Sequence, residues 1–343
     1  MFALLPQTAY DCVMKQERLI PLPEYARLTG TPETTIRLHL KEGRIRGVRL
    51  GRYWYIPVEV EVETEAAKAR VFTFFTHAGG AGKTSLARDL SFELASWGYR
   101  VLLVDADPQA NLTAWMGMDP GEVEDRETLI SVVHDKGFPD PRRAVIQGVV
   151  LDLVPANMNL AMAEVMVPTK NLGMVLLRTA LYESGLLDRY DFVLVDSPPS
   201  LGSIAAMSAL AGEGLIVPVE TSAKGMQALK GVLEVSKDYL RTLLALRLLS
   251  PTQAGFIRLL VPTKYDSRTA QDRKMKLLLE EASRVGPLAP PIAYRPAPYK
   301  EAIDQGLPVQ AVGDEKVHEE MKAVAQAFLQ SLGLENKEVS RWV

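Results

Sequence analysis

Cysteine is almost absent from this 343-residue sequence, which contains Cys12 alone. A single cysteine excludes disulfide bonds within the chain and an iron–sulfur cluster held by several cysteines. Long hydrophobic runs are also missing, since none approaches the ~18 apolar residues that a membrane-spanning helix needs. Residues 1–6 lack the basic start and the sustained apolar stretch of a secretory signal. We therefore expect a cytoplasmic protein that does not bind a membrane.

A strong excess of charge of either sign is absent as well. The formal net charge is −3, so total charge indicates neither an acidic nor a basic partner. The length allows one large core together with an accessory domain. Evidence about function therefore has to come from motifs.

The most informative stretch is residues 76–85, which join a β-branched and aromatic run to a helical pattern with leucine at every fourth position. A strand, a glycine-rich turn and a helix N-terminus form a phosphate-binding loop, because backbone N–H groups there converge on phosphate oxygens. Lys83 would reach the β- and γ-phosphates, and the Thr84 hydroxyl would bind Mg²⁺. The alternative is a glycine-rich turn that binds no nucleotide, and two further motifs argue against it.

This loop resembles the variant phosphate-binding loop of the ParA/MinD family, Lys-Gly-Gly-x-Gly-Lys-Thr, except that the family's first lysine falls on Ala78. The resemblance implies an ATPase that uses ATP and Mg²⁺ and works as a homodimer. It also implies which residues of the loop bind ATP: Gly79, Gly80, Ala81, Gly82, Lys83, Thr84 and Ser85.

Two aspartate motifs follow strand-like runs. Residues 105–111 resemble the family's Asp-x-Asp-Pro-Gln-x-Asn motif, which assigns Asp107 to positioning the attacking water. The same resemblance assigns Asp105 to the water shell of Mg²⁺ and to a switch loop. Asp196 ends an apolar run, as in a Walker B strand whose carboxylate holds Mg²⁺ through water. An Asx-turn is the alternative at 105–107, but it explains one aspartate and not the whole run.

Two later segments resemble family elements beside the base. The residues that they would contribute to ATP binding are Pro262, Thr263, Asp266 and Arg295. Family members often bind DNA without sequence specificity near this region. One expected helix carries the corresponding basic residues here, among them Arg268, Arg273 and Lys274. The alternative is a solvated helix face.

The missing lysine at Ala78 raises the question of a substitute, because the family's lysine crosses the dimer interface to the partner's phosphates. We expect Lys224, placed in a loop after the strand at 214–219, to be the best candidate. Lys264, after the strand at 255–261, is the second. The alternative is that both are ordinary surface lysines.

The large domain, assigned to residues 67–343, alternates strands and helices, which indicates an α/β fold with a doubly wound, mostly parallel sheet. The expected strands are 71–76, 100–104, 150–154, 191–195, 214–219 and 255–261. An apolar stripe along 315–332 indicates a packing helix, although a membrane-targeting helix is the alternative.

The region before this domain is divided into an arm, 1–20, and a winged helix-turn-helix, 21–66. Two short helices precede a basic hairpin expected to turn near Gly51, and the module resembles excisionase and MerR proteins. From Ile36 to Arg52 there are six Lys or Arg residues and one acid, which is the charge pattern of a DNA-binding face. Its expected DNA contacts are Arg37, Lys41, Arg44, Arg49 and Arg52. The alternatives are a protein-binding winged helix and, for residues 58–70, either an edge strand or a linker helix.

Together these features predict a ParA-like partition ATPase associated with the nucleoid. ATP would assemble a dimer that binds DNA, and a ParB-like adaptor would stimulate hydrolysis and release it. The N-terminal module would bind an operator and regulate its own expression. One alternative is a transcription regulator that ATP switches with negligible turnover, and another is MinD-like positioning at a membrane.

Overall fold

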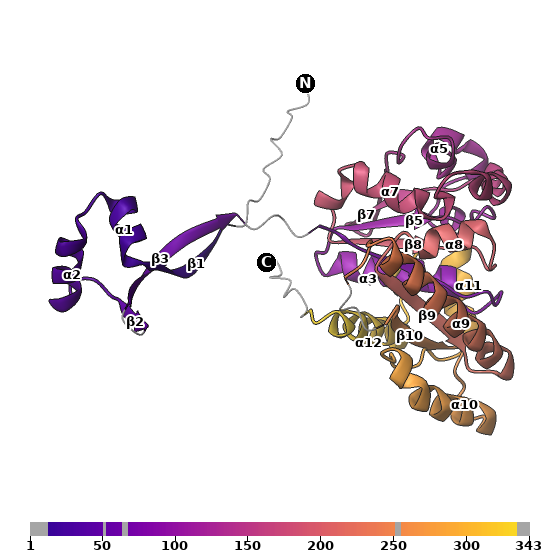
Figure 1. Cartoon of the computed structure of the whole chain (residues 1–343). Helices are drawn as coiled ribbons and strands as arrows, with labels where there is room; N and C mark the ends of the chain where they lie inside the picture. Colours follow the sequence, from indigo (N-terminus) through magenta and orange to yellow (C-terminus); the bar gives the residue numbers. More distant parts are fainter. Residues whose placement is uncertain (1–12, 51–52, 64–67, 251–254, 335–343) are drawn as a thin grey trace. The chain divides into compact units, whose positions relative to one another are not determined.

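The computed structural model describes residues 13–50, 53–63, 68–250 and 255–334. The chain divides into two compact units, Met1–Ala67 and Lys68–Val343, next to the boundary expected after residue 66 (Figure 1). None of the helices in the described part of the chain has the length and apolar composition needed to cross a membrane.

The first unit combines two helices with a three-stranded antiparallel sheet of order β1-β3-β2. Its small core contains Leu22, Ile36 and Ile56, one from each of α1, α2 and β3. Its elements in chain order are β1 (Val13–Pro21), α1 (Leu22–Thr29), α2 (Glu33–Lys41), β2 (Val48–Leu50) and β3 (Tyr53–Glu63). Strands β2 and β3 pair antiparallel from Val48↔Tyr55 to Leu50↔Tyr53, as the expected hairpin requires, whereas Gly51, where the turn was expected, lies outside the described residues.

Two expectations about the first unit are corrected. Residues 13–20, assigned to a featureless arm, belong to strand β1, which pairs with β3 from Val13↔Glu63 to Pro21↔Tyr55. Of the two alternatives for residues 58–70, the strand is confirmed for 58–63, which belong to β3, but its expected place at the edge is wrong because β3 is the middle strand. Both errors have one cause: the two segments are stabilised by pairing with each other, and a local pattern does not reveal that partner.

A seven-stranded sheet of order β10-β9-β4-β8-β5-β7-β6 forms the centre of the second unit. All neighbouring pairs are parallel except β6 and β7. The strands are β4 (Arg70–Phe74), β5 (Val101–Asp105), β6 (Arg142–Ile146), β7 (Val149–Val154), β8 (Phe192–Asp196), β9 (Gly214–Glu220) and β10 (Ile257–Thr263). The predicted doubly wound, mostly parallel sheet is confirmed, and only the edge strand β6 was missed.

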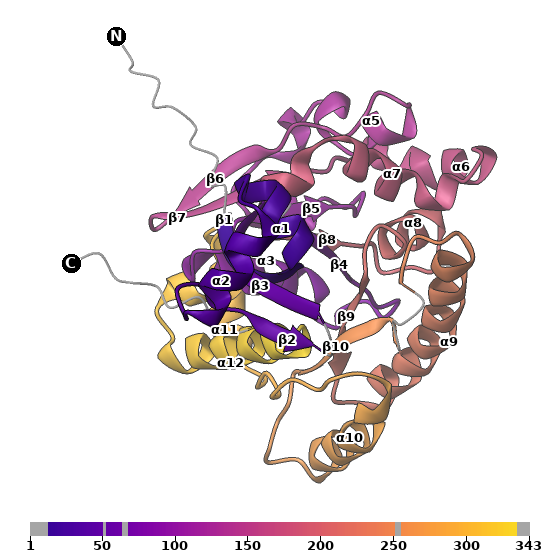
Figure 2. The same cartoon turned by 60° about the vertical axis from the view of Figure 1, so that its left-hand side comes forward.

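Helices cover both faces of this sheet (Figures 1 and 2). Phe72 of β4 packs with Leu90 of α3 and Phe328 of α12 on one face, and α7, α8 and α9 pack on the other. The helices are α3 (Lys83–Ser96), α4 (Asn111–Trp115), α5 (Ile130–Val133), α6 (Ala163–Met166), α7 (Leu176–Glu183), α8 (Ser203–Ala209), α9 (Ala223–Ala245), α10 (Ala270–Glu281), α11 (Pro296–Asp304) and α12 (Glu315–Ser331). The stripe on α12 is buried in the core, as a packing helix requires.

Candidate nucleotide-binding site

A glycine-rich loop connects β4 to the N-terminus of α3. Gly80 and Gly82 have φ angles of +80° and +83°, in the left-handed region that favours glycine. Gly82 is the residue before the first helical residue, Lys83, so the loop turns directly into the helix. The free N–H groups and the dipole at this helix N-terminus suit a bound phosphate.

Lys83 forms a buried ion pair with Asp196, the last residue of β8. Its Nζ lies 3.0 Å from Asp196 Oδ1 and also donates to the carbonyl oxygen of Ser197. Lys83 is 6% exposed and Asp196 is fully buried. The other carboxylate oxygen of Asp196, Oδ2, is buried and has no hydrogen-bond partner among the described residues. The structure therefore brings together Lys83 of the predicted phosphate loop and Asp196 of the predicted Walker B strand, which come from separate motifs.

Asp105 lies on β5 directly opposite Asp196 of β8. Its Oδ1 accepts from the Asp107 N–H at 3.1 Å, and its Oδ2 accepts from the Thr113 N–H and hydroxyl at 2.9 and 2.7 Å. Burial, together with the negative charge of Asp196, raises the pKa of Asp105 to about 7. Because both oxygens already accept hydrogen bonds, Asp105 is better placed to order the 105–113 turn than to bind a metal ion directly.

Asp107 lies nearer to solvent and lines a cavity that also contains Lys83 and Thr84. Its Oδ1 accepts from the Gln109 N–H at 2.9 Å, which orients the carboxylate. Burial raises its pKa, and the charge of Lys83 opposes this effect. Asp107 is therefore the aspartate of its motif that a ligand in the cavity would meet.

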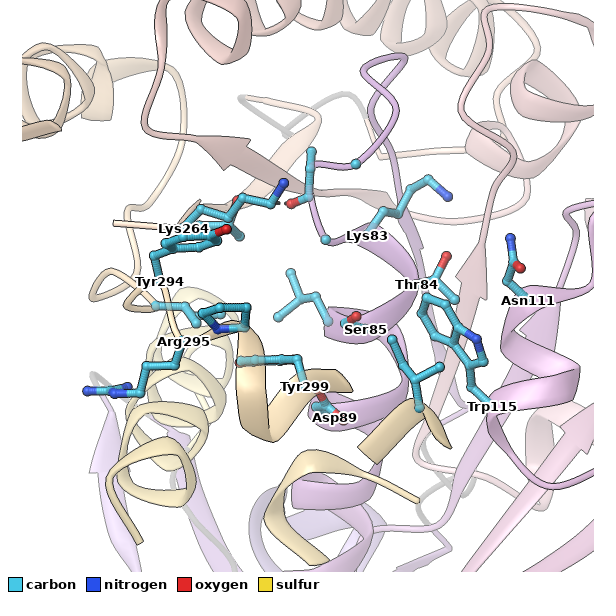
Figure 3. A pocket seen from close by; sticks show the side chains of 18 of the residues that line it. Lys83, Thr84, Ser85, Asp89, Asn111, Trp115, Lys264, Tyr294, Arg295 and Tyr299 are labelled. Carbon is cyan, nitrogen blue, oxygen red and sulfur yellow. Dashed lines mark hydrogen bonds between the residues drawn. The ribbon is translucent and has the colours of Figure 1, made fainter. Parts of the chain in front are cut away.

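The cavity has a volume of about 490 Å³ and runs from the phosphate loop along the first turns of α3. Tyr294, Arg295 and Tyr299 line one side, and Asn111 and Trp115 of α4 line the other (Figure 3). A charged loop at one end and aromatic walls at the other suit a nucleotide, whose base is flat and apolar and whose phosphates are anionic.

The residues predicted beside the base are only partly brought into this cavity. Thr263 and Arg295 line it, and the Thr263 hydroxyl donates to the Ala81 carbonyl oxygen at 2.9 Å, which joins β10 to the phosphate loop. Pro262 and Asp266 are not among the lining residues, and neither is Gly79 of the predicted phosphate loop. Asp266 is instead bonded through both oxygens to Arg268, which holds the pKa of that carboxyl at about 2.

The aromatic residues Trp115, Tyr294 and Tyr299 were missed by sequence reasoning. Trp115 follows the Asp-Pro-Gln motif closely in the sequence, and this nearness could have indicated that it lies at the nucleotide site. Tyr294 directly precedes Arg295 in a segment that resembles a family element, and this position was a signal that was not used, whereas Tyr299 lies four residues further on.

The two candidate lysines differ in position. Lys224 lies in the first turn of α9 and not in the loop where it was expected, and it is not among the cavity-lining residues. Lys264 follows β10 and lines the cavity. Of the two, Lys264 is therefore the one that the fold brings to the phosphate loop of its own subunit.

The predicted DNA contacts occupy two separate places. On the second unit, Arg273 and Lys274 are exposed on α10, whereas Arg268 precedes that helix. The expectation of one helix carrying Arg268 was wrong, because Asp266 accepts from the N–H and guanidinium of Arg268 and forms a turn before the helix starts.

On the first unit, the predicted DNA contacts are exposed where the structure describes them. Arg37 and Lys41 lie on α2, and Arg44 and Arg49 follow it. Arg37 forms an exposed ion pair with Glu33 at 3.6 Å, and Arg44 forms one with Glu42 at 3.0 Å. Arg52 lies outside the described residues. Such exposed pairs are weak and can be exchanged for contacts to a phosphate backbone.

Comparison with known proteins agrees with this geometry. Residues 69–245 match the family described as "AAA domain". The chain is 49% identical over 318 residues to the probable plasmid-partitioning protein ParA of Thermus thermophilus, covering 92% of this chain and 94% of that protein.

Solved structures share the fold. The ATP complex of a variant of Cyanothece McdA has a TM-score of 0.65 at 22% identity, covering 78% of this chain and 98% of that one. Cobyrinic acid a,c-diamide synthase of Mycobacterium smegmatis, with bound ADP and magnesium, has a TM-score of 0.58 at 27% identity. That likeness covers 77% of this chain and 96% of that one. The family match and the 49% identity over nine-tenths of the chain establish that this protein belongs to the ParA family of ParA/MinD-type P-loop ATPases.

Proposed function

We propose that this protein is a ParA-like partition ATPase that moves or positions DNA cargo. ATP would assemble a two-fold dimer that is able to bind DNA. Hydrolysis stimulated by the adaptor would then release the dimer and reset the cycle. The observation that carries the proposal is the buried pair of Lys83 and Asp196 at one end of a nucleotide-sized cavity. The name of the Thermus thermophilus relative supports partition as the purpose of the cycle.

Lys83 and Asp107 would perform the central steps. Lys83 exchanges its contact with Asp196 for the β- and γ-phosphates, whose charge it neutralises. Asp107 orients the attacking water, and its raised pKa suits a group that accepts a proton or a hydrogen bond from that water.

The residues present fit Mg²⁺. In the described part of the chain, no three His, Cys, Asp or Glu side chains are grouped to hold a metal ion. Mg²⁺ in phosphoryl-transfer sites does not need such a group, because phosphates and water supply most of its ligands. The Thr84 hydroxyl would hold the ion directly and the Asp196 carboxylate would hold it through water, with Asp105 ordering the adjacent turn. Asp196 Oδ2, which has no hydrogen-bond partner among the described residues, is available for that water. When bound, Mg²⁺ supplies positive charge to the phosphate oxygens.

DNA and an adaptor complete the proposed cycle. The ATP dimer would bind DNA without sequence specificity through Arg268, Arg273 and Lys274, on the nucleoid in the cytoplasm. Residues 21–66 would bind an operator as a winged helix-turn-helix and repress the protein's own expression. The adaptor would resemble ParB and stimulate hydrolysis.

Ala78 supports a second candidate function, an ATP-switched transcription regulator with negligible turnover. In the ParA interpretation, another lysine, Lys224 or Lys264, supplies the charge of the missing one. In the regulator interpretation, nothing replaces it and ATP binding alone sets the DNA affinity. A sharp rise in the rate of ATP hydrolysis in Ala78→Lys would favour the regulator. It would show that the fold still accommodates the family's lysine, which this sequence has lost.

The test combines ATP turnover with gel filtration. Turnover is measured alone, with DNA, and with DNA plus the adaptor, while gel filtration in ATP and in ADP reports assembly. Dimers in ATP and stimulated turnover support the partition ATPase. ATP-dependent dimers whose turnover stays negligible under every condition favour the regulator, and failure to bind ATP contradicts both.

A further inference from the structure

Lys264 lies over the phosphate-binding loop of its own subunit. Its Nζ is 3.8 Å from the position that a β-carbon on Gly80 would occupy. The side chain extends from the end of β10 toward the loop, on the opposite side from Lys83 (Figure 3). A second ammonium group therefore reaches the loop, separate from the one at the start of α3.

The backbone around Lys264 holds it in this position. Lys264 has a φ of +55°, in the left-handed region that few residues other than glycine occupy. The carbonyl oxygen of Lys264 accepts a hydrogen bond from the Thr221 hydroxyl at 3.3 Å. The N–H of the next residue, Tyr265, donates to the carbonyl oxygen of Ile292 at 3.0 Å. The hydroxyl of Thr263, the residue before Lys264, donates a hydrogen bond to the Ala81 carbonyl oxygen and so joins the end of β10 to the phosphate-binding loop.

The charge balance of the loop leaves a role for this ammonium group. Position 78 carries no charge, and Lys83 is paired with Asp196. The partner of Lys264 is Glu220, at 3.6 Å between Nζ and Oε2, and both side chains are partly exposed. Such an exposed pair is weak, so phosphate oxygens arriving beside Gly80 would compete well for the lysine.

We propose that Lys264 binds the phosphates of ATP from within the same subunit and supplies the positive charge that the loop lacks at Ala78. This inference rests on the proposed ATPase function. It differs from a lysine supplied by a partner, because the contact exists in each subunit before any dimer forms.

Nucleotide affinity and turnover of single variants test the proposal. We expect Lys264→Ala to weaken ATP binding about tenfold or more, and to lower turnover. We expect Lys264→Arg to retain most of both, because it keeps the charge. Lys237→Ala, which removes an exposed lysine from α9, is the matched control and should match wild type.

Glu220→Gln separates a phosphate contact from a structural ion pair. It breaks the same pair as Lys264→Ala but keeps the ammonium group, so ATP affinity should be maintained or increased. Equal losses in Glu220→Gln and Lys264→Ala would overturn the proposal, and so would wild-type ATP affinity and turnover in Lys264→Ala. Either result, obtained while wild type binds and hydrolyses ATP, would leave the proposed ATPase function standing.

Monomeric protein distinguishes the source of the charge. At concentrations where gel filtration shows monomers, Lys264→Ala should already bind ATP more weakly than wild type. A loss that occurs only under dimer-forming conditions would instead indicate a lysine acting across an interface, and would overturn the assignment to the same subunit.

Discussion

The imidazole ring of His77 fills the space beside Gly231, so that a β-carbon added to Gly231 would lie 2.7 Å from the His77 Cε1. His77 stands at the start of the phosphate loop, and Gly231 lies inside the long helix α9. Glycine inside a helix costs about 1 kcal/mol relative to alanine, so a helix of this length would ordinarily gain from Gly231→Ala. A methyl group at position 231 would require the His77 ring to turn away, so this contact connects α9 to the loop.

The first prediction is that Gly231→Ala weakens ATP binding and does not gain the stability of about 1 kcal/mol that alanine usually brings inside a helix, because the ring of His77 must move out of place. Urea denaturation and ATP titration measure the two effects. The double variant His77→Ala/Gly231→Ala should recover stability, since the smaller side chain leaves room for the new methyl group. If the Gly231→Ala variant were more stable than wild type, the phosphate loop would be able to shift and make room for the methyl group at little cost.

The second prediction concerns Lys83→Ala, which should abolish detectable ATP binding because the β- and γ-phosphates lose their principal cation. It should also lower the free energy of unfolding by about 3–5 kcal/mol, since Asp196 is left buried without its partner. ATP titration and chemical denaturation measure the two effects. ATP binding at full affinity by this variant would contradict the assignment of the site.

A double variant separates loss of function from loss of fold in that experiment. Lys83→Met/Asp196→Asn replaces both charges by neutral groups of similar size, so most of the stability should return. ATP binding should not return with it. A double variant as unstable as Lys83→Ala would mean that the site depends on more than this pair.

The third prediction is that Asp107→Ala retains ATP-dependent dimers but loses turnover by a factor of about 10²–10⁴, because a group that orients water acts mainly on the barrier. Gel filtration in ATP and phosphate release measure the two properties. Thr113→Ala is the comparison: it disturbs the hydrogen bonds of Asp105 and should alter stability as well. Hydrolysis at the wild-type rate by Asp107→Ala would contradict the assignment of Asp107 as the group that orients the attacking water.

The central sheet could be predicted from the sequence because its strands are short apolar runs, buried on both faces. Val101–Asp105 and Phe192–Asp196 are examples in which each residue is buried. Asp105 was identified by its resemblance to a family motif and Asp196 as the residue that ends an apolar run. The structure places them opposite each other, because the ends of neighbouring parallel strands meet at one edge. Strand β6 was missed because it is an edge strand that begins with two arginines, Arg142 and Arg143, and lacks this pattern.

The walls of the cavity could not be predicted in the same way. Tyr299 on α11 and Trp115 on α4 line the same cavity, but they are brought together only when the chain folds around the sheet. Likewise, the pairing of β1 with β3 joins two segments whose own patterns are weak. Motifs identify residues that contact phosphate, whereas packing determines which side chains surround the rest of a ligand.

The fourth prediction uses pH. Glu93 on α3 is buried, and burial raises the pKa of its carboxyl above the ordinary 4.5, although Gln310, His318 and Lys322 oppose the shift. The folded state therefore retains a proton that the unfolded chain has released, and stability falls as pH rises from about 4.5 through the folded pKa. Glu93→Gln removes this contribution.

We therefore expect Glu93→Gln to gain stability relative to wild type as pH rises through that interval, and denaturation of both proteins at several pH values measures the difference. Groups distant from Glu93 cancel in the comparison, whereas His318, whose Nε2 lies 3.4 Å from the Glu93 carboxylate, does not. A difference that does not change with pH would show that Glu93 titrates normally despite its burial.

The last prediction separates the two units. A protein lacking residues 1–66 should bind ATP with wild-type affinity, because the cavity is built entirely from the second unit. It should lose protection of a specific operator while keeping ATP-dependent binding to arbitrary DNA, since Arg273 and Lys274 remain. In the full chain, Arg37→Ala or Lys41→Ala should reduce operator discrimination by about 1–3 kcal/mol if the side chain contacts a base. A uniform loss across all sequences would instead indicate phosphate contacts, and operator protection by the truncated protein would contradict the assignment of specific binding to residues 21–66.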